Sequence, residues 1–267
     1  MDETSRFLEL HSAQNLAPGE AALGRIARAF SALPYENVTK ILKQARSNST
    51  RASLRDAGEV FGDHLRWGTG GTCFSLCNAL SKLVAGAGFD AFIAMADMHY
   101  GKDIHCAVVV RLDGSRFLLD PGYLLHQPIR FPEVGGSTQI RTAMNETSLV
   151  WEGDHLFSLY TTEVSQTKWR YRLKAIPVSD QEFTDHWIHS FSLNTMEHLM
   201  LSRCNANGRT YFRKGTLEQV AHQTRQKSRL DSGCSGELAR LFGVPADMIR
   251  LAQNALLARS STPVLHG

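Results

Sequence analysis

The sequence lacks a long hydrophobic run. No apolar stretch among its 267 residues approaches the ~20 residues of a membrane-spanning helix. The first residues, Met1 to Arg6, also lack the apolar core of a signal peptide. We therefore expect no membrane association and a cytoplasmic location.

Cysteine is scarce, and its spacing fits neither disulfides nor zinc. The five cysteines are odd in number and contain no C-x-x-C pair; they are Cys73, Cys77, Cys106, Cys204 and Cys234. Three histidines, His186, His189 and His198, come with no cysteine or carboxylate at a ligand spacing. We expect no metal site.

The chain also has little excess charge of either sign. Its 29 basic and 26 acidic residues leave a net charge of +3, which gives no support for nucleic-acid binding but suits a phosphorylated small molecule. There is no internal repeat or low-complexity tract. With 43% hydrophobic residues, the chain can bury a large core and hold two or three subdomains.

One cysteine lies between a glycine-rich turn and an apolar helix. Residues 68–80 read G-T-G-G-T-C-F-S-L-C-N-A-L, which puts Cys73 at the expected helix start. Unpaired N–H groups and the helix dipole favour a thiolate there, and they can also hold an oxyanion. Cys73 is therefore a candidate nucleophile.

A histidine and an aspartate follow on two predicted strands. Asp113-Gly114 is a two-residue hairpin signal between residues 104–112 and 115–120. If these two residues form the turn, Asp120 faces Ala107, and His105 lies on the same sheet face, diagonal to Asp120. The pattern predicts a Cys-His-Asp triad in which Asp120 orients His105 and His105 deprotonates Cys73.

Each of the three residues also has an ordinary structural explanation. Cys73 falls on the buried stripe of its helix, His105 fits a satisfied polar group of a strand, and Asp120 before Pro121 fits the start of a turn. The conjunction of all three with the glycines favours catalysis. Cys77 is one turn from Cys73 and fits core packing, and Cys106 is expected on the sheet face opposite His105.

Periodicity predicts helices first and short strands next. Leu23, Ile26, Ala27 and Phe30 mark a helix that stops before Pro34, and residues 45–57 read as a surface loop. Six short strands between Phe89 and Ile176 suggest an antiparallel barrel or a strongly bent sheet. Beyond Pro177 the sequence predicts a helix over 181–190, a hairpin with Asn205-Ala206-Asn207-Gly208 as its turn, and helices near 236–242 and 245–259.

These motifs together resemble the arylamine N-acetyltransferase family. The matching segments are Pro34-Tyr35-Glu36-Asn37 (P-F-E-N in the family), Gly70-Gly71-Thr72-Cys73-Phe74 (R-G-G-x-C-F), Ile104-His105, and Leu119-Asp120-Pro121-Gly122-Tyr123 (V-D-x-G-F). The wider transglutaminase-like superfamily shares the order Cys, His, Asp. The P-Y-E-N and D-P-G-Y segments make the narrower family the better match.

The resemblance implies a fold and a set of site residues. The fold is α+β, with an N-terminal helical bundle (1–88), a central antiparallel β-barrel (89–177) and a C-terminal α/β lid (178–267). The implied catalytic residues are Cys73, His105 and Asp120. The implied substrate-binding residues are Tyr35, Phe74, Ile104 and Gly122, although Tyr35 also fits a core aromatic at a helix end.

The chain departs from the family pattern at three places. Thr69 stands where the family has Arg, so a charged anchor of the cysteine loop is expected to be missing. Leu124 replaces a glycine beside the site, and the family's Pro-x-Ser-x-Phe has no good counterpart in residues 192–197. These changes point to altered donor or acceptor recognition.

The activity implied by the resemblance is acyl transfer, from acetyl-CoA as co-substrate to an aromatic amine or hydrazine, with no permanently bound cofactor. Three alternatives stay open at this point. They are an amide synthase that takes a longer or carrier-protein-bound acyl group, a transglutaminase-like cysteine hydrolase, and a binding protein that has kept the fold.

Overall fold

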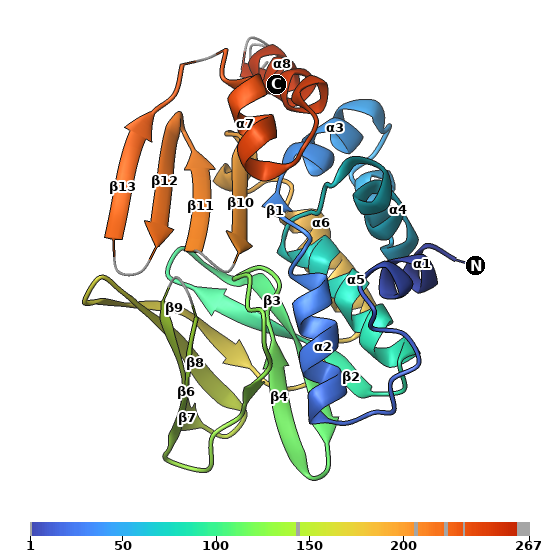
Figure 1. Ribbon diagram of the computed structural model, residues 1–267, viewed down its shortest axis with the longest axis vertical. Helices are drawn as coiled ribbons and strands as arrows, with labels where there is room; N and C mark the ends of the chain where they lie inside the picture. The colour runs from blue at the N-terminus through green and yellow to red at the C-terminus, as the bar shows by residue number, and fades with distance from the viewer. Residues whose placement is uncertain (1, 143–144, 206–207, 222–223, 232, 261–267) are drawn as a thin grey trace, which may run out of the picture.

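The computed structural model describes residues 2–142, 145–205, 208–221, 224–231 and 233–260. These residues form eight α-helices, an eight-stranded sheet and a five-stranded sheet (Figure 1). The predicted α+β class, with helices first, a barrel-like antiparallel sheet next and a sheet with helices at the C-terminal end, is confirmed. No helix in these ranges is long and apolar enough to cross a membrane.

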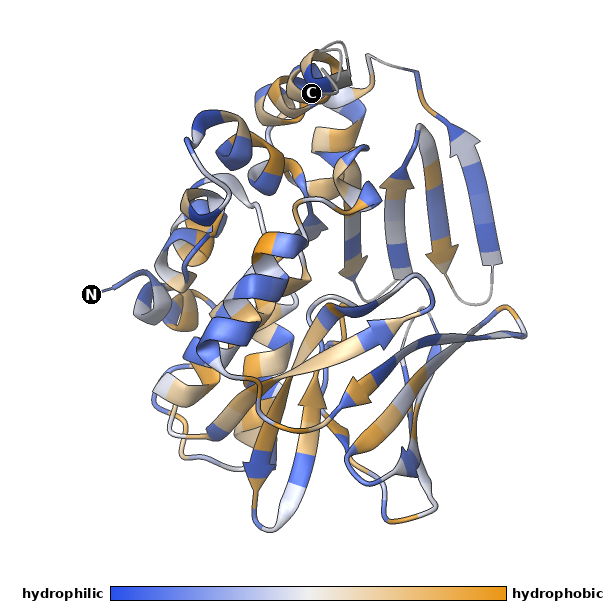
Figure 2. Ribbon diagram, turned by 180° about the vertical axis from the view of Figure 1, so that it is seen from behind, coloured by the Kyte–Doolittle hydropathy of each residue, from blue (hydrophilic) through white to orange (hydrophobic). Residues whose placement is uncertain are grey.

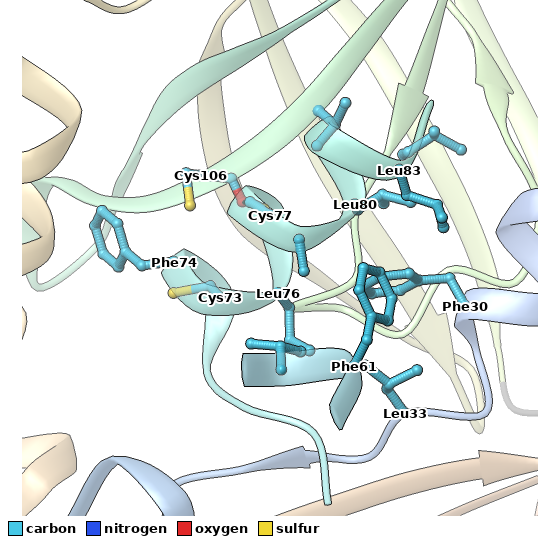
Figure 3. Close-up of a cluster of buried hydrophobic side chains, with 14 of the residues drawn as sticks. Phe30, Leu33, Phe61, Cys73, Phe74, Leu76, Cys77, Leu80, Leu83 and Cys106 are labelled. Carbon is cyan, nitrogen blue, oxygen red and sulfur yellow. The ribbon is translucent and has the colours of Figure 1, made fainter. Parts of the chain in front are cut away.

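The N-terminal helices surround one buried helix, α5. The helices are α1 (Glu3–Leu10), α2 (Glu20–Phe30), α3 (Val38–Arg46), α4 (Ala57–Trp67) and α5 (Cys73–Gly86). The helix predicted before Pro34 is α2. The apolar stripe of α5, which includes Leu76, Leu80 and Leu83, lies toward Phe30 and Phe61 (Figure 3).

The larger sheet is nearly closed into a barrel. Its order is β5-β4-β3-β2-β9-β8-β7-β6, and its edge strands β5 and β6 approach each other. The strands are β2 (Asp90–Met98), β3 (Gly101–Leu112), β4 (Ser115–Leu119), β5 (Ile129–Arg130), β6 (Ser137–Arg141), β7 (Glu146–Gly153), β8 (Leu156–Glu163) and β9 (Gln166–Lys174). The sequence prediction missed β5 and β7.

The β3–β4 hairpin has the predicted register. Leu112 pairs with Ser115, and Val108 pairs with Leu119, so the two-residue turn is Asp113-Gly114. Both turn residues have positive φ, +49° and +73°, as this kind of turn requires. The strand pairing thereby brings the start of β3 beside the residue that follows β4.

The five-stranded sheet has the order β1-β10-β11-β12-β13. Its strands are β1 (Tyr35–Glu36), β10 (Met200–Asn205), β11 (Gly208–Arg213), β12 (Thr216–Ala221) and β13 (Thr224–Arg229). The predicted hairpin is β10–β11, with Asn205 opposite Gly208, while residues 206 and 207 of its predicted turn lie outside the described residues. The sequence prediction missed β12 and β13, and Figure 2 shows β13 as hydrophilic along its length.

Three helices complete the C-terminal part. They are α6 (Asp180–His189), α7 (Ser235–Phe242) and α8 (Ala246–Ser260), close to the predicted ranges. A strand from the N-terminal part of the chain joins the C-terminal sheet. It is β1, from the Pro34–Asn37 segment, which pairs with β10. That pairing lies next to the cysteine loop.

Candidate active site

Cys73 is the first residue of α5. Thr72 before it has extended backbone angles, and the first helical hydrogen bond runs from Leu76 N to Thr72 O. The N–H groups of residues 73–75 therefore have no partner within the helix. Cys73 is 9% exposed and lies in the wall of a cavity of about 430 Å³.

Strand β1 fixes the glycine loop (residues 68–72) in front of this helix. Glu36 N donates to Gly71 O at 2.9 Å, and Gly71 N donates to Pro34 O at 3.3 Å. A Cβ added at Gly70 would lie 1.9 Å from Pro34 O. The P-Y-E-N segment and the two glycines are thus one packing unit, in which position 70 has no room for a side chain.

The glycine loop has a charged anchor, contrary to the expectation based on Thr69. Arg55, 3% exposed, donates from Nη1 to Gly70 O at 2.6 Å and pairs through Nη2 with Asp63 at 2.7 Å. Gly70 N in turn donates to Oε1 of the buried Glu36 at 3.3 Å. The predicted surface loop over 45–57 is wrong at Arg55, because its guanidinium is buried against the glycine loop.

His105 and Asp120 are in direct contact. His105 Nε2 lies 2.9 Å from Asp120 Oδ2, and both side chains are almost fully buried. The other carboxylate oxygen accepts from Tyr123 N at 3.0 Å, which fixes the carboxylate. Because Nε2 is taken by Asp120, Nδ1 is the imidazole nitrogen left to face Cys73.

The thiol of Cys73 is more acidic than an ordinary thiol. The Cys106 thiol and then the His105 imidazole hydrogen-bond it, and together they hold the pKa of Cys73 well below 9.0 against the opposing effect of burial. Burial alone would lower the pKa of His105, but Asp120 and Cys73 outweigh it and raise this pKa well above 6.5. The favoured state is a thiolate beside an imidazolium.

Cys106 projects to the opposite sheet face from His105, as predicted. It packs with Val108 and Val110 against the helices, and Figure 3 shows its sulfur beside α5. Burial raises the pKa of Cys106 well above 9.0, so its thiol stays protonated and can donate. Cys77 donates to Cys106 O at 3.1 Å and belongs to the core.

The loop after β4 brings its backbone against the reacting groups. A Cβ added at Gly122 would lie 2.7 Å from His105 Cε1 and 3.1 Å from Cys73 Cβ. Leu124, which replaces the family's second glycine, has a φ of +55° and is buried. The loop thus keeps a left-handed backbone at this position although the residue is not glycine.

Aromatic and apolar residues line the cavity around Cys73. All four predicted substrate-binding residues are in the lining: Tyr35, Phe74, Ile104 and Gly122. Phe74 is fixed from behind by α6, with its ring 5.5 Å from that of Phe183 and stacked on Trp187 at 6.4 Å. The region next to the sulfur therefore suits a flat, apolar group.

The segment 192–197, where the family motif is absent, also borders the cavity. Asn37 Nδ2 donates to Thr195 O at 3.1 Å and His198 O at 2.8 Å, and its Oδ1 accepts from Met200 N at 2.8 Å. Leu193 and Thr195 line the cavity. The asparagine of P-Y-E-N thus holds this altered segment in place.

The other end of the cavity is strongly basic. We call it the basic mouth; its cationic side chains are Lys168, Arg170, Arg209, Arg213, Arg225 and Lys227. Two carboxylates oppose them. Glu163, 4% exposed, pairs with Arg225 at 2.7 Å, and Glu218 pairs with Arg209 at 3.1 Å. The cations outnumber the carboxylates, so the mouth favours a polyanion.

No group of three or more His, Cys, Asp or Glu side chains within the described ranges is placed to hold a metal ion.

Comparison with known families identifies the chain. A family model described as N-acetyltransferase matches residues 21–245. The chain belongs to the arylamine N-acetyltransferase family. The resemblance predicted from its motifs is confirmed, and the members of this family are acetyltransferases. A search of curated proteins by sequence found no match.

Solved structures of arylamine N-acetyltransferases share the fold. The Mycobacterium abscessus enzyme has a TM-score of 0.79 at 17% identity, covering 94% of this chain and 93% of its own. The Salmonella typhimurium enzyme has a TM-score of 0.77 at 16% identity, covering 96% and 99%. A Bacillus cereus enzyme, described as having a Cys-His-Glu catalytic triad, has a TM-score of 0.73 at 15% identity, covering 92% and 100%. In this chain the carboxylate in contact with His105 belongs to Asp120.

Sequence reasoning missed several residues of this site. Tyr171 is fully buried, with its ring 4.8 Å from that of His105, and the alternation of β9 could have placed it inside the barrel. Arg55 and Lys40 carried no signal, because charged residues in a polar loop and on a short helix read as solvent-facing. The contact of Cys106 with Cys73 depends on how α5 docks on β3.

Proposed function

We propose that this protein transfers an acetyl group from acetyl-CoA to an aromatic amine or hydrazine through a thioester on Cys73. The observation that carries the proposal is a cavity lined by Cys73 and by His105, whose imidazole is held by the buried Asp120, with aromatic residues around Cys73 and a basic mouth. The comparisons give no support to an acyl carrier protein as the donor.

In the first half-reaction the Cys73 thiolate attacks the thioester carbonyl. The oxyanion that forms is stabilised by the unpaired N–H groups of Cys73 and Phe74 at the start of α5. The bond between the carbonyl carbon and the CoA sulfur then breaks. The His105 imidazolium gives its proton to the departing CoA thiolate, and Cys73 is left acetylated.

In the second half-reaction the amine attacks the acetyl group on Cys73. His105 takes a proton from the amine nitrogen, and Asp120 stabilises the imidazolium. The bond to the Cys73 sulfur breaks and restores the thiolate. The apolar surroundings favour an aromatic amine over a hydrated alkylammonium, because the latter would lose its hydration without a partner.

The basic mouth supports CoA as the leaving thiol. CoA carries phosphate groups far from its sulfur, and the six cations of the basic mouth come from β9, β11 and β13, whereas Cys73 lies on α5. Arg213 is the strongest candidate for a phosphate contact. Its buried Nε has no hydrogen-bond partner in the described part of the chain, and unlike Arg209 and Arg225 it forms no ion pair with a carboxylate there.

The decisive assay is the release of free CoA from acetyl-CoA with and without an amine. The proposal expects at most about one CoA per protein molecule without an amine, from acetylation of Cys73, and continued release only when an arylamine or hydrazine is present. Release at the same rate with water alone would favour the cysteine hydrolase instead.

A variant assay tests the role of the basic mouth. Combined Arg213→Gln and Lys227→Gln changes are expected to raise KM for acetyl-CoA by about threefold to tenfold. They should leave KM for S-acetyl-N-acetylcysteamine, which has no phosphate, unchanged. Lys102→Gln, which removes an exposed charge outside the cavity lining, is the control. Equal effects on both donors would contradict phosphate recognition.

A further inference from the structure

A buried lysine lines the cavity and has no assigned contact with substrate, although its charge also helps to lower the pKa of Cys73. Lys40, in the first turn of α3, is 6% exposed. Its Nζ donates to Ser190 O at 3.0 Å and to Ser190 Oγ at 2.7 Å, and it lies 4.1 Å from the centroid of the Phe191 ring. Lys40 and Ser190 border the same cavity as Cys73.

Fold stability does not explain a lysine at this position. A cation in the first turn of a helix opposes the helix dipole. Burial of an ammonium also costs free energy unless a carboxylate pairs with it. In the described ranges, the lysines that form ion pairs are Lys43, Lys174 and Lys227, and Lys40 is not among them.

The contacts of Lys40 hold its ammonium without neutralising it. Ser190 follows the last residue of α6, so its carbonyl lies at the negative end of that helix. The Ser190 hydroxyl donates to Trp187 O at 2.6 Å, which turns its lone pairs toward Lys40. Burial lowers the pKa of Lys40 to about 8, so the group is mostly charged at neutral pH. The two bonds to Ser190 use two of its three protons.

We propose that Lys40 selects substrates that carry a carboxylate, which it binds while the reacting atoms lie at Cys73. This inference rests on the proposed acyl transfer. The carboxylate can be carried by either of the two substrates. It can belong to the amine acceptor, as in an aminobenzoate, or to the acyl group of the donor, as in the thioester of a dicarboxylic acid.

The test compares charged and neutral substrates of matched shape. In the acceptor arm, kcat/KM is measured for 4-aminobenzoate and for its methyl ester, with acetyl-CoA as the donor. In the donor arm, malonyl-CoA is compared with butyryl-CoA, with one neutral arylamine as the acceptor. Each comparison is made in the unmodified protein and in the Lys40→Met, Lys40→Arg and Lys43→Met variants.

Lys40→Met is expected to lower the ratio of charged to neutral kcat/KM by about tenfold or more in one arm, and that arm identifies the source of the carboxylate. Lys40→Arg should keep most of the ratio. Lys43→Met is the matched control, because Lys43 lies on the same helix and pairs with Glu59 outside the cavity. Its ratios should not change.

Two results would overturn the proposal. One is an equal loss for charged and neutral substrates in both arms, which would mean that Lys40 acts on Cys73 or on folding. The other is no change in either ratio. Binding of 4-aminobenzoate, its methyl ester, malonyl-CoA and butyryl-CoA to Cys73→Ala protein, measured by calorimetry, repeats both comparisons without turnover. The selectivity is thus tested even if the proposed transfer fails.

Discussion

At the scale of single residues, the chemistry depends on what surrounds one sulfur atom. Cys73 lies between two donors from β3, the Cys106 thiol and the His105 imidazole, which approach it from opposite sheet faces. Asp120 holds the imidazole at 2.9 Å. Alternation along one strand therefore supplies two neighbours that both lower the pKa of the same thiol.

The pH dependence of alkylation tests this arrangement. Because the pKa of Cys73 is lowered, the thiolate persists as the pH falls below 9.0, and iodoacetamide should react rapidly at neutral pH. Cys106→Ala and His105→Gln each remove one donor, so each should move the alkylation midpoint to higher pH. Cys77→Ala leaves both donors and should not move it. A midpoint at or above 9.0 in the unmodified protein would contradict the paired state.

At the scale of elements, the site is assembled by the contacts of two loops. The glycine loop is clamped between β1 and Arg55, and the loop after β4 reaches Cys73 through Gly122. Neither loop is positioned by its own sequence alone, because each depends on a partner far along the chain.

Arg55→Met should destabilise the protein. The change leaves Asp63 and Gly70 O without their partner, and breaking a buried pair costs on the order of 3 kcal/mol. Urea unfolding measures the loss of free energy of unfolding. Arg51→Met, on the same connection but exposed, should stay within about 0.5 kcal/mol of the unmodified protein. Equal stability of the two variants would mean that Arg55 is not an anchor.

Gly122→Ala should impair catalysis more than folding. The added Cβ forces His105 or Cys73 to move, and a displacement near 1 Å costs about 100-fold in rate. Activity and thermal unfolding are measured side by side. Gly86→Ala, at the other end of α5 with no atom within 4 Å of the added Cβ, is the control. Full activity in the Gly122 variant would show that the loop does not pack as described.

For the molecule as a whole, the cavity joins parts that are distant in sequence. The helices supply Cys73, the barrel supplies His105, and β11–β13 supply much of the basic mouth. Glu163 on β8 pairs with Arg209 on β11 and Arg225 on β13, so ion pairs connect the two sheets at this mouth. The aromatic region around Cys73 and the basic mouth thus have different electrostatics.

Salt should weaken binding at the basic mouth and leave binding near Cys73 unchanged. Raising the ionic strength from about 0.1 M to about 1 M shortens the Debye length from about 10 Å to about 3 Å. KM for acetyl-CoA should rise, while KM for S-acetyl-N-acetylcysteamine should stay constant. The two donors can be compared with one arylamine at fixed pH. A parallel change in both KM values would count against an electrostatic role of the mouth.

The sequence predicted the parts of this molecule that are governed by local rules. The Asp113-Gly114 turn set the register that joins His105 to Asp120, and apolar periodicity located α2 and α5. β13 could not be predicted, because T-R-Q-K-S-R has no apolar alternation and most of its side chains are exposed. The burial of Arg55 and Lys40 depends on tertiary contacts, which neither composition nor spacing records.

The central claim is that Cys73 carries the acetyl group, and intact-protein mass spectrometry tests it most directly. After incubation with acetyl-CoA and no amine, the protein should gain the mass of one acetyl group, which peptide mapping should assign to Cys73. Addition of an arylamine should remove that mass and yield the N-acetylated amine. The Cys73→Ala variant should gain nothing. An unmodified protein that forms the acetylated amine without passing through the acetylated state, or a Cys73→Ala variant that still forms it, would contradict the account.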